Sequence, residues 1–153
     1  MTKKIAICIM FALVALIGVT AVAQTAPTLT PAQQAVAGKW DEQNGGGILE
    51  LTIKDGVLYG KILHTSNKLD NNGVCKNCDG ARKNQPYVGM NIMYGFKPEG
   101  NTDVWGGGSI VDVANGRMLS AKIKAQNGGK ELNVRGYIGS PMLGETKIWK
   151  RVN

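Results

Sequence analysis

Histidine and phenylalanine are scarce in this 153-residue chain, which holds one His and two Phe. The single histidine, His64, is the only candidate base for a Ser or Cys nucleophile, and no Gly-x-Ser-x-Gly turn accompanies it. The chain also lacks a phosphate-binding Gly-x-x-x-x-Gly-Lys-Ser/Thr loop, a second Cys-x-x-Cys pair and clustered basic residues interleaved with aromatics. These absences argue against the common catalytic, nucleotide-binding and nucleic-acid-binding patterns. We therefore predict no catalytic residue, no cofactor, no resident metal and no nucleic-acid partner.

The composition that remains is that of a single folded domain. Hydrophobic residues make up 43% of the chain and charged residues 19%, which is too apolar for a disordered segment. A mass of 16.3 kDa leaves room for one domain of the commonest size. The 21 glycines follow no three-residue period, which excludes a collagen-like chain.

The N-terminus has the pattern of a secretory signal peptide. Lys3 and Lys4 precede an apolar run from Ile5 to Val19, and Ala21–Ala23 supply a small-x-small cleavage pattern. An uncleaved anchor is the alternative, but the strongly apolar part is shorter than the roughly 20 residues that cross a bilayer. We predict a signal peptide over residues 1–23, a leader over 24–37 and export to the periplasm or the extracellular space. Contact with the membrane would then be transient and confined to the signal peptide.

Cleavage would leave two cysteines, Cys75 and Cys78, because Cys8 lies within the signal peptide. In an oxidising compartment two cysteines at this spacing favour a disulfide, which we predict. The alternative is a redox or metal-dependent enzyme that uses these two thiols with His64. Loss of Lys3 and Lys4 leaves 16 basic residues against 11 acidic ones, a mature net charge of +5.

Beyond the leader, the hydrophobic pattern has the period of β-strands. Thr30, Pro31 and Gln33 predict a short capped helix that Gly38 ends. Alternating apolar and polar residues separated by turn residues then predict strands over 39–42, 49–54, 58–64, 88–96, 103–113, 119–125, 131–138 and 146–152. A long, aperiodic loop at 65–87 contains both cysteines. About eight strands predict an all-β fold, a closed antiparallel barrel formed by residues 38–153 as one domain.

A series of short motifs runs in order from Gly38 to Val152. They include Gly38-Lys39-Trp40, Gly60-Lys61-Ile62, Val88-Gly89-Met90, Gly95-Phe96-Lys97-Pro98, Trp105-Gly106-Gly107, Val134-Arg135-Gly136-Tyr137-Ile138-Gly139 and Trp149 with Arg151-Val152. Together they resemble the bacterial secreted family catalogued as domain of unknown function 2147. The resemblance implies an exported protein with a small lipocalin-like β-barrel and no established activity. Trp40 after a short helix, with Arg151 near the end of the last strand, also resembles the pair that closes one end of lipocalin barrels.

Large side chains on the predicted strands are the candidate binding residues. We expect Trp40 and Tyr94 inside the barrel, whereas the phase of their strands leaves the direction of Trp105, Tyr137 and Trp149 open. Arg135 would offer a contact for an anion or a hydrogen-bonding group. The candidate site is the set Trp40, Tyr94, Trp105, Arg135, Tyr137 and Trp149.

Because the predicted barrel is closed and the chain shows no catalytic pattern, we predict a non-enzymatic binder, and a barrel of this size holds at most one small ligand. Its partner would be a small, partly apolar or anionic molecule or an envelope protein. A purely structural or stress-related envelope component is the remaining alternative, and the sequence does not separate the two.

Overall fold

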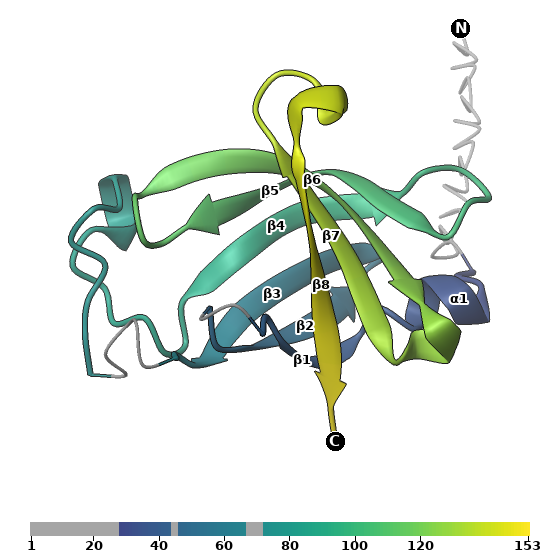
Figure 1. Cartoon of the computed structure of the whole chain (residues 1–153), viewed down its shortest axis with the longest axis horizontal. Helices are drawn as coiled ribbons and strands as arrows, with labels where there is room; N and C mark the ends of the chain where they lie inside the picture. The colour runs from purple at the N-terminus through teal and green to yellow at the C-terminus, as the bar shows by residue number, and fades with distance from the viewer. Residues whose placement is uncertain (1–27, 44–45, 67–71) are drawn as a thin grey trace, which may run out of the picture.

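The computed structural model describes residues 28–43, 46–66 and 72–153, which form a closed barrel of antiparallel strands (Figure 1). The predicted signal peptide and residues 24–27 of the leader lie outside the described residues. The strands are β1 (Gly38–Asp41), β2 (Ile48–Lys54), β3 (Val57–His64), β4 (Asn91–Pro98), β5 (Val104–Asp112), β6 (Arg117–Gln126), β7 (Glu131–Tyr137) and β8 (Glu145–Val152). Each strand pairs with the next, and β8 pairs back onto β1, which confirms the predicted eight-stranded closure.

The period-two pattern gives the barrel its inner face. Leu49 and Leu51 on β2 and Leu58 and Ile62 on β3 are almost fully buried. The β2–β3 connection is a two-residue turn whose Asp55 and Gly56 have φ values of 51° and 73°. Two consecutive positive φ angles match the right-handed twist of a tight hairpin, which is why Asp-Gly is favoured there.

The short helix α1 (Pro31–Gln34) begins with the predicted cap. The Thr30 hydroxyl accepts from the Gln33 amide at 3.1 Å, and the Gln33 side chain accepts from the Thr30 amide at 2.9 Å. Gln33 is only 3% exposed, and its side-chain nitrogen donates to the carbonyl of Thr102 at 2.8 Å. The indole of Trp105 donates to the Gln33 carbonyl at 3.0 Å. These contacts seat the helix across one end of the barrel.

Arg151 on β8 ties the helix to the barrel. Its guanidinium donates to the carbonyls of Ala35, Ala37 and Gly129, and it lies 4.2 Å from the ring centroid of the fully buried Trp40. One side chain therefore joins the end of α1, the β6–β7 turn and the last strand, with charge-assisted hydrogen bonds and a cation–π contact.

Strand β4 departs from regular alternation, and this corrects one expectation. Met93 pairs with Ile110 of β5, and Tyr94 pairs with Ser109, so the side chains of Met93 and Tyr94 point to opposite faces of the sheet. The β3–β4 register shifts on both sides of Gly60, and Gly95 has a φ of 73°, which is typical of a bulge. The prediction that Tyr94 lies inside the barrel is therefore wrong, because the irregular register gives Met93 the inner position and turns the phenol outward.

Close packing near the closed end requires a glycine on β5. A Cβ atom at Gly108 would lie 2.4 Å from the ring of Phe96, which is fully buried. The missing side chain therefore makes room for an aromatic ring from the neighbouring strand.

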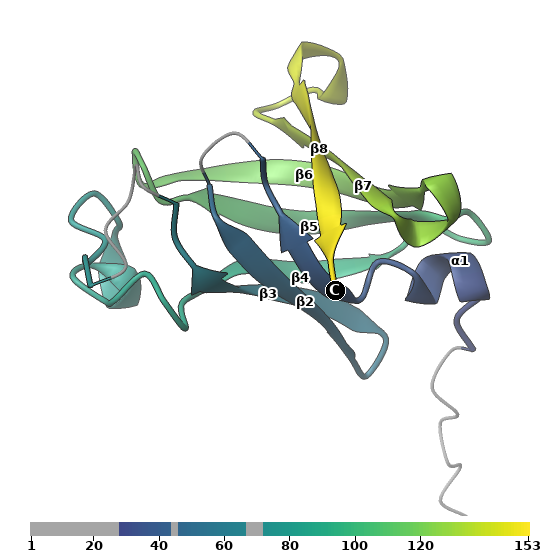
Figure 2. The same ribbon diagram turned by 60° about the horizontal axis from the view of Figure 1, so that its bottom comes forward.

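The connections divide between the two barrel ends (Figure 1 and Figure 2). Helix α1 and the β2–β3, β4–β5 and β6–β7 turns lie at the closed end, and the other connections lie at the opposite end. The 3₁₀ turns are η1 (Gly80–Arg82), η2 (Asn127–Gly129) and η3 (Pro141–Leu143). Over the described stretches, no helix has the length and apolar character to span a bilayer.

Candidate functional site

A cavity of about 570 Å³ opens at the barrel end opposite α1. Its walls are mainly aliphatic side chains from six strands, β2 to β7, including Leu49, Ile62, Ile92, Ile110, Leu119 and Val134. The volume lies within the roughly 300–1,000 Å³ typical of small-molecule sites. The interior of the barrel is therefore partly hollow, and its free space is apolar.

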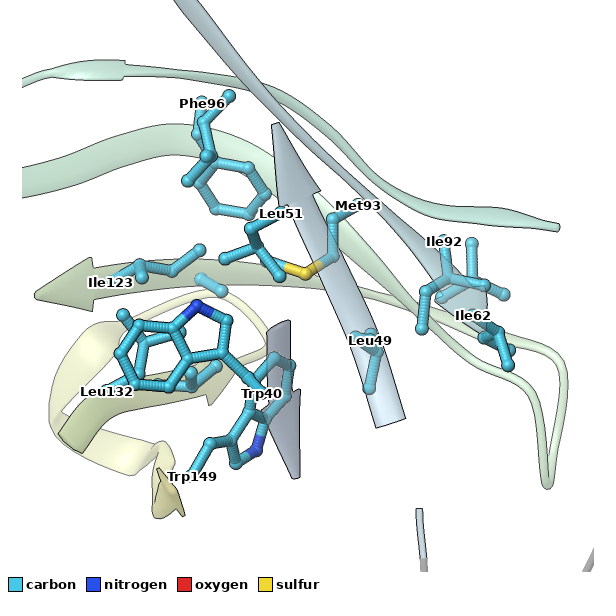
Figure 3. Packing of buried hydrophobic residues seen from close by; sticks show 14 of the residues in the cluster. Trp40, Leu49, Leu51, Ile62, Ile92, Met93, Phe96, Ile123, Leu132 and Trp149 are labelled. Atoms are coloured by element: carbon cyan, nitrogen blue, oxygen red, sulfur yellow. The ribbon is translucent and has the colours of Figure 1, made fainter. Parts of the chain in front are cut away.

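The hollow lies at one end because side-chain size changes along the barrel. Trp40, Trp105 and Phe96 are fully buried and fill the half next to α1. Figure 3 shows Trp40 and Phe96 of this group, with the smaller Leu49, Ile62 and Ile92 set apart from them. In the open half Gly136 contributes no side chain, and a Cβ there would meet only Leu119, at 3.5 Å. Small residues on facing strands thus leave space that three aromatic rings occupy at the other end.

An ion pair lies in the cavity wall. Lys147 pairs across β7–β8 with the buried Val134, so it faces the interior, and its Nζ lies 2.6 Å from Oε1 of Glu42. The hydrogen bond to Glu42 raises the pKa of Lys147 above its ordinary value, more than burial lowers it, and the charges of Glu145 and Asp112 add to the rise. Lys147 therefore stays charged and already has a partner within the wall.

The rim of the cavity carries more acid than base. Three carboxylates line it, those of Glu42, Asp112 and Glu145, against the two cations Arg117 and Lys147. This balance is opposite in sign to the whole chain, whose net charge is +7. An anionic ligand would meet a mouth with a small excess of negative charge.

The cavity wall includes one unpaired donor. Trp149 is 3% exposed and lines the cavity, and its indole nitrogen has no hydrogen-bond partner. Figure 3 shows that nitrogen on the edge of the ring away from the Trp40 indole. An unpaired buried donor costs about 1–3 kcal/mol, so an acceptor brought to this edge would recover that energy.

The structure separates the six predicted site residues. Trp149 lines the cavity, and Tyr137 borders it. Trp40 and Trp105 belong to the closed end, where Trp40 donates to the Val36 carbonyl at 2.8 Å.

The other two predicted residues lie on the outer face of the barrel. Tyr94 donates to the carbonyl of Asn91 and lies 6.0 Å below the guanidinium of Arg82. Arg135 alternates with the inward Val134 and donates to carbonyls of the β7–β8 connection. The pleat of β7 thus keeps Arg135 away from both tryptophans of the closed end.

Sequence reasoning missed Glu42 and Lys147. A signal existed, because Lys147, Trp149 and Arg151 are spaced by two along β8 and must share one face. Once Arg151 is assigned to the closed end, Trp149 and Lys147 follow it inward. Glu42 could not be found this way, because it lies just after β1 and reaches Lys147 only when β1 pairs with β8.

The predicted disulfide joins Cys75 to Cys78, with a Cα–Cα distance of 5.4 Å. Both cysteines are buried, and the loop that carries them contacts the β5–β6 turn, where Asn77 donates to the carbonyl of Ala114 at 2.8 Å. Ala114 lines the cavity, so the bridge orders a loop that supports its rim. His64 ends β3 and is exposed. In the described parts of the chain, no three His, Cys, Asp or Glu residues gather as metal ligands.

Comparisons with known proteins agree with this architecture. One solved structure, protein HP1028 from the human pathogen Helicobacter pylori, which belongs to the lipocalin family, superposes with a TM-score of 0.65 at 15% identity. The match covers 76% of this chain and 82% of that protein, and at this identity it shows the fold alone. A search of curated proteins found no match. Residues 38–151 match the family described as "Uncharacterized protein conserved in bacteria (DUF2147)". The chain therefore belongs to the bacterial family DUF2147, and it folds as a lipocalin-like barrel.

Proposed function

We propose that this protein binds a small, neutral, partly apolar molecule in the open half of its barrel. The observation that carries the proposal is the 570 Å³ cavity with aliphatic walls. A hollow of this size inside a closed barrel removes an apolar ligand from water without any rearrangement of the strands, and each buried CH₂ contributes about 0.8 kcal/mol.

The polar groups of the cavity favour a neutral ligand that carries an oxygen acceptor. Trp149 offers an unpaired N–H at the apolar wall. The two cations that share its strand face are already engaged, because Lys147 pairs with Glu42 and Arg151 donates to three carbonyls. A carboxylate beside the indole would be a buried charge with no free cation on this face of β8, whereas a hydroxyl or carbonyl oxygen needs only the indole.

The location we propose is the bacterial envelope or the exterior. The lysines, apolar run and small residues of 1–23 support export, and the Cys75–Cys78 disulfide fits an oxidising compartment. N-terminal sequencing of the protein recovered from cell fractions tests this location. A chain that keeps residue 1 and is found in the cytoplasm would contradict this location.

The cavity itself can be tested with a neutral fluorescent probe. N-phenyl-1-naphthylamine should bind the mature protein, and Leu119→Trp should abolish binding because Leu119 lines the cavity. The matched control is Ser120→Trp, which adds the same side chain at the next position, on the outer face. Retention of the probe by Leu119→Trp, or no binding to the wild type, would refute the cavity as the binding site.

Competition against the probe tests the ligand class. We expect 1-decanol to displace it at a concentration at least about tenfold lower than decane or decanoate, corresponding to one hydrogen bond of about 1.4 kcal/mol. Trp149→Phe should remove the advantage of decanol over decane and leave probe binding intact. A preference for decanoate would instead support the anionic ligand class.

A further inference from the structure

The β7–β8 connection exposes apolar side chains beyond the body of the barrel. Ile138, Met142 and Leu143 are 62%, 88% and 85% exposed, which are the highest values among the exposed large hydrophobic residues that the structure describes. Figures 1 and 2 both show this hairpin projecting from the end of β7 and β8. We call residues 138–144 the hairpin tip. Such exposure costs solubility and marks a surface that meets an apolar partner.

The hairpin tip is held in a defined shape. Arg135 donates to the carbonyls of Pro141 and Met142, at 2.7 and 3.3 Å, and to the Thr146 hydroxyl at 2.8 Å. The Ser140 hydroxyl accepts from the Met142 amide and caps η3. Gly144 has no room for a side chain, because a Cβ there would lie 2.6 Å from the Gly136 carbonyl. The apolar side chains are therefore presented outward without the entropy cost of ordering a loose loop.

A basic hollow lies on the outer face of β5, β6 and β7, and β7 leads to the tip. It measures about 230 Å³, and Lys122, Lys124 and Arg135 line it. Lys122 and Arg135 are direct cross-strand neighbours, an arrangement of like charges that destabilises a sheet. Lys122 has Glu99 at 2.9 Å, but Lys124 and Arg135 have no carboxylate partner within the described segments. An anionic partner would offset this repulsion.

We propose that the hairpin tip and the basic hollow together dock the protein onto an anionic lipid surface. Met142 and Leu143 would enter the boundary between headgroups and acyl chains, and lipid phosphates would lie against Lys124. The combination of a small apolar tip with cations on the outer face of the adjoining strands favours a bilayer over a protein partner, because three exposed apolar residues cover far less area than a stable protein interface. Leu143 and Ile138 also line the cavity, so the hairpin tip borders the cavity mouth.

Vesicle co-sedimentation tests the proposal with the mature chain. We expect binding to vesicles of phosphatidylglycerol and phosphatidylethanolamine, at least tenfold weaker binding to phosphatidylcholine, and a loss of affinity when salt rises from about 0.05 to 0.5 M. Met142→Ser should weaken binding to the anionic vesicles about tenfold or more, and Lys124→Gln should weaken it and reduce its salt dependence. The matched control is Met118→Ser, which removes an apolar side chain that is 47% exposed on β6.

Three results would overturn the docking surface. These are no binding of the wild type to anionic vesicles, equal loss in Met142→Ser and Met118→Ser, and a wild-type dimer in light scattering that Met142→Ser dissociates. The last result would assign the tip to an interface between two copies of the chain. Met142 does not line the cavity, so Met142→Ser also separates this proposal from the proposed function. Probe binding should be unchanged in this variant whether or not the vesicles bind.

Discussion

Removal of the Arg151 guanidinium should open the closed end of the barrel. Arg151→Met keeps most of the apolar stem but leaves the carbonyls of Ala35, Ala37 and Gly129 without their donor and the Trp40 ring without its cation. Hydrogen bonds that involve a charged group contribute about 1.5–3 kcal/mol each. Water reaches these half-buried carbonyls, and the three losses are not additive, so we expect about 3 kcal/mol in total.

The assay is thermal and urea unfolding of the mature protein. For a domain of about 115 residues, 1 kcal/mol shifts the melting temperature by about 4 °C, so Arg151→Met should melt about 12 °C below the wild type. Arg151→Lys keeps the charge but not the fork of donors, and it should fall between the two. This intermediate variant provides a measurement even where Arg151→Met folds poorly.

Arg135→Met is the matched control, because Arg135 also donates three hydrogen bonds. Its partners lie within eleven residues on the exposed β7–β8 connection, whereas those of Arg151 reach 116 residues along the chain. Loss of the local set should cost about 1 kcal/mol or less, since solvent replaces it. Equal destabilisation by the two variants, or a loss under 1 kcal/mol for Arg151→Met, would refute the assignment of Arg151 as the tie between helix and barrel.

Three further outcomes follow from the packing and the ion pairs. Gly108→Ala should cost about 1–3 kcal/mol in urea unfolding, because its Cβ would lie 2.4 Å from the buried Phe96 ring. The hydrogen bond from Lys150 lowers the pKa of Glu131 below its ordinary value of 4.5. The ion pair therefore stabilises the fold above that pH, and this contribution is lost on acidification. Glu131→Gln should reduce the fall of the melting temperature as the pH drops below 4.5. Replacing Cys75 and Cys78 by Ser should cost about 2 kcal/mol in the same urea assay, because the bridge closes a short ring.

Most of the fold could be predicted because its signals are local. The alternation of Leu49, Leu51 and Ile53, followed by Asp55 and Gly56, specifies a strand and a tight turn without reference to any other segment. Repeated eight times, such signals leave a closed antiparallel sheet as the arrangement that buries one face and leaves no open edge. The cap formed by Thr30 is local in the same sense.

The direction of individual side chains was less predictable, as Tyr94 illustrates. A phase read along β4 fails wherever the strand gains a residue, and the register irregularities around Gly95 are set by how β4 meets β3 and β5. The two-residue period of β8 alone also did not predict whether the Trp149 side chain points into or out of the barrel. Its direction became clear only with the closed end in place, where Arg151, two residues further on, faces inward over Trp40.

From the amino-acid order alone came the strands, the turns, the capped helix and the disulfide, because each depends on residues that are neighbours in the chain. Tertiary structure decided where the barrel is hollow, which charges share its mouth and how the hairpin tip projects. The ion pair of Glu42 and Lys147 joins residues 105 positions apart, and it exists only because the last strand closes against the first. Such contacts depend on register, bulges and closure, which are properties of the whole sheet rather than of any one segment.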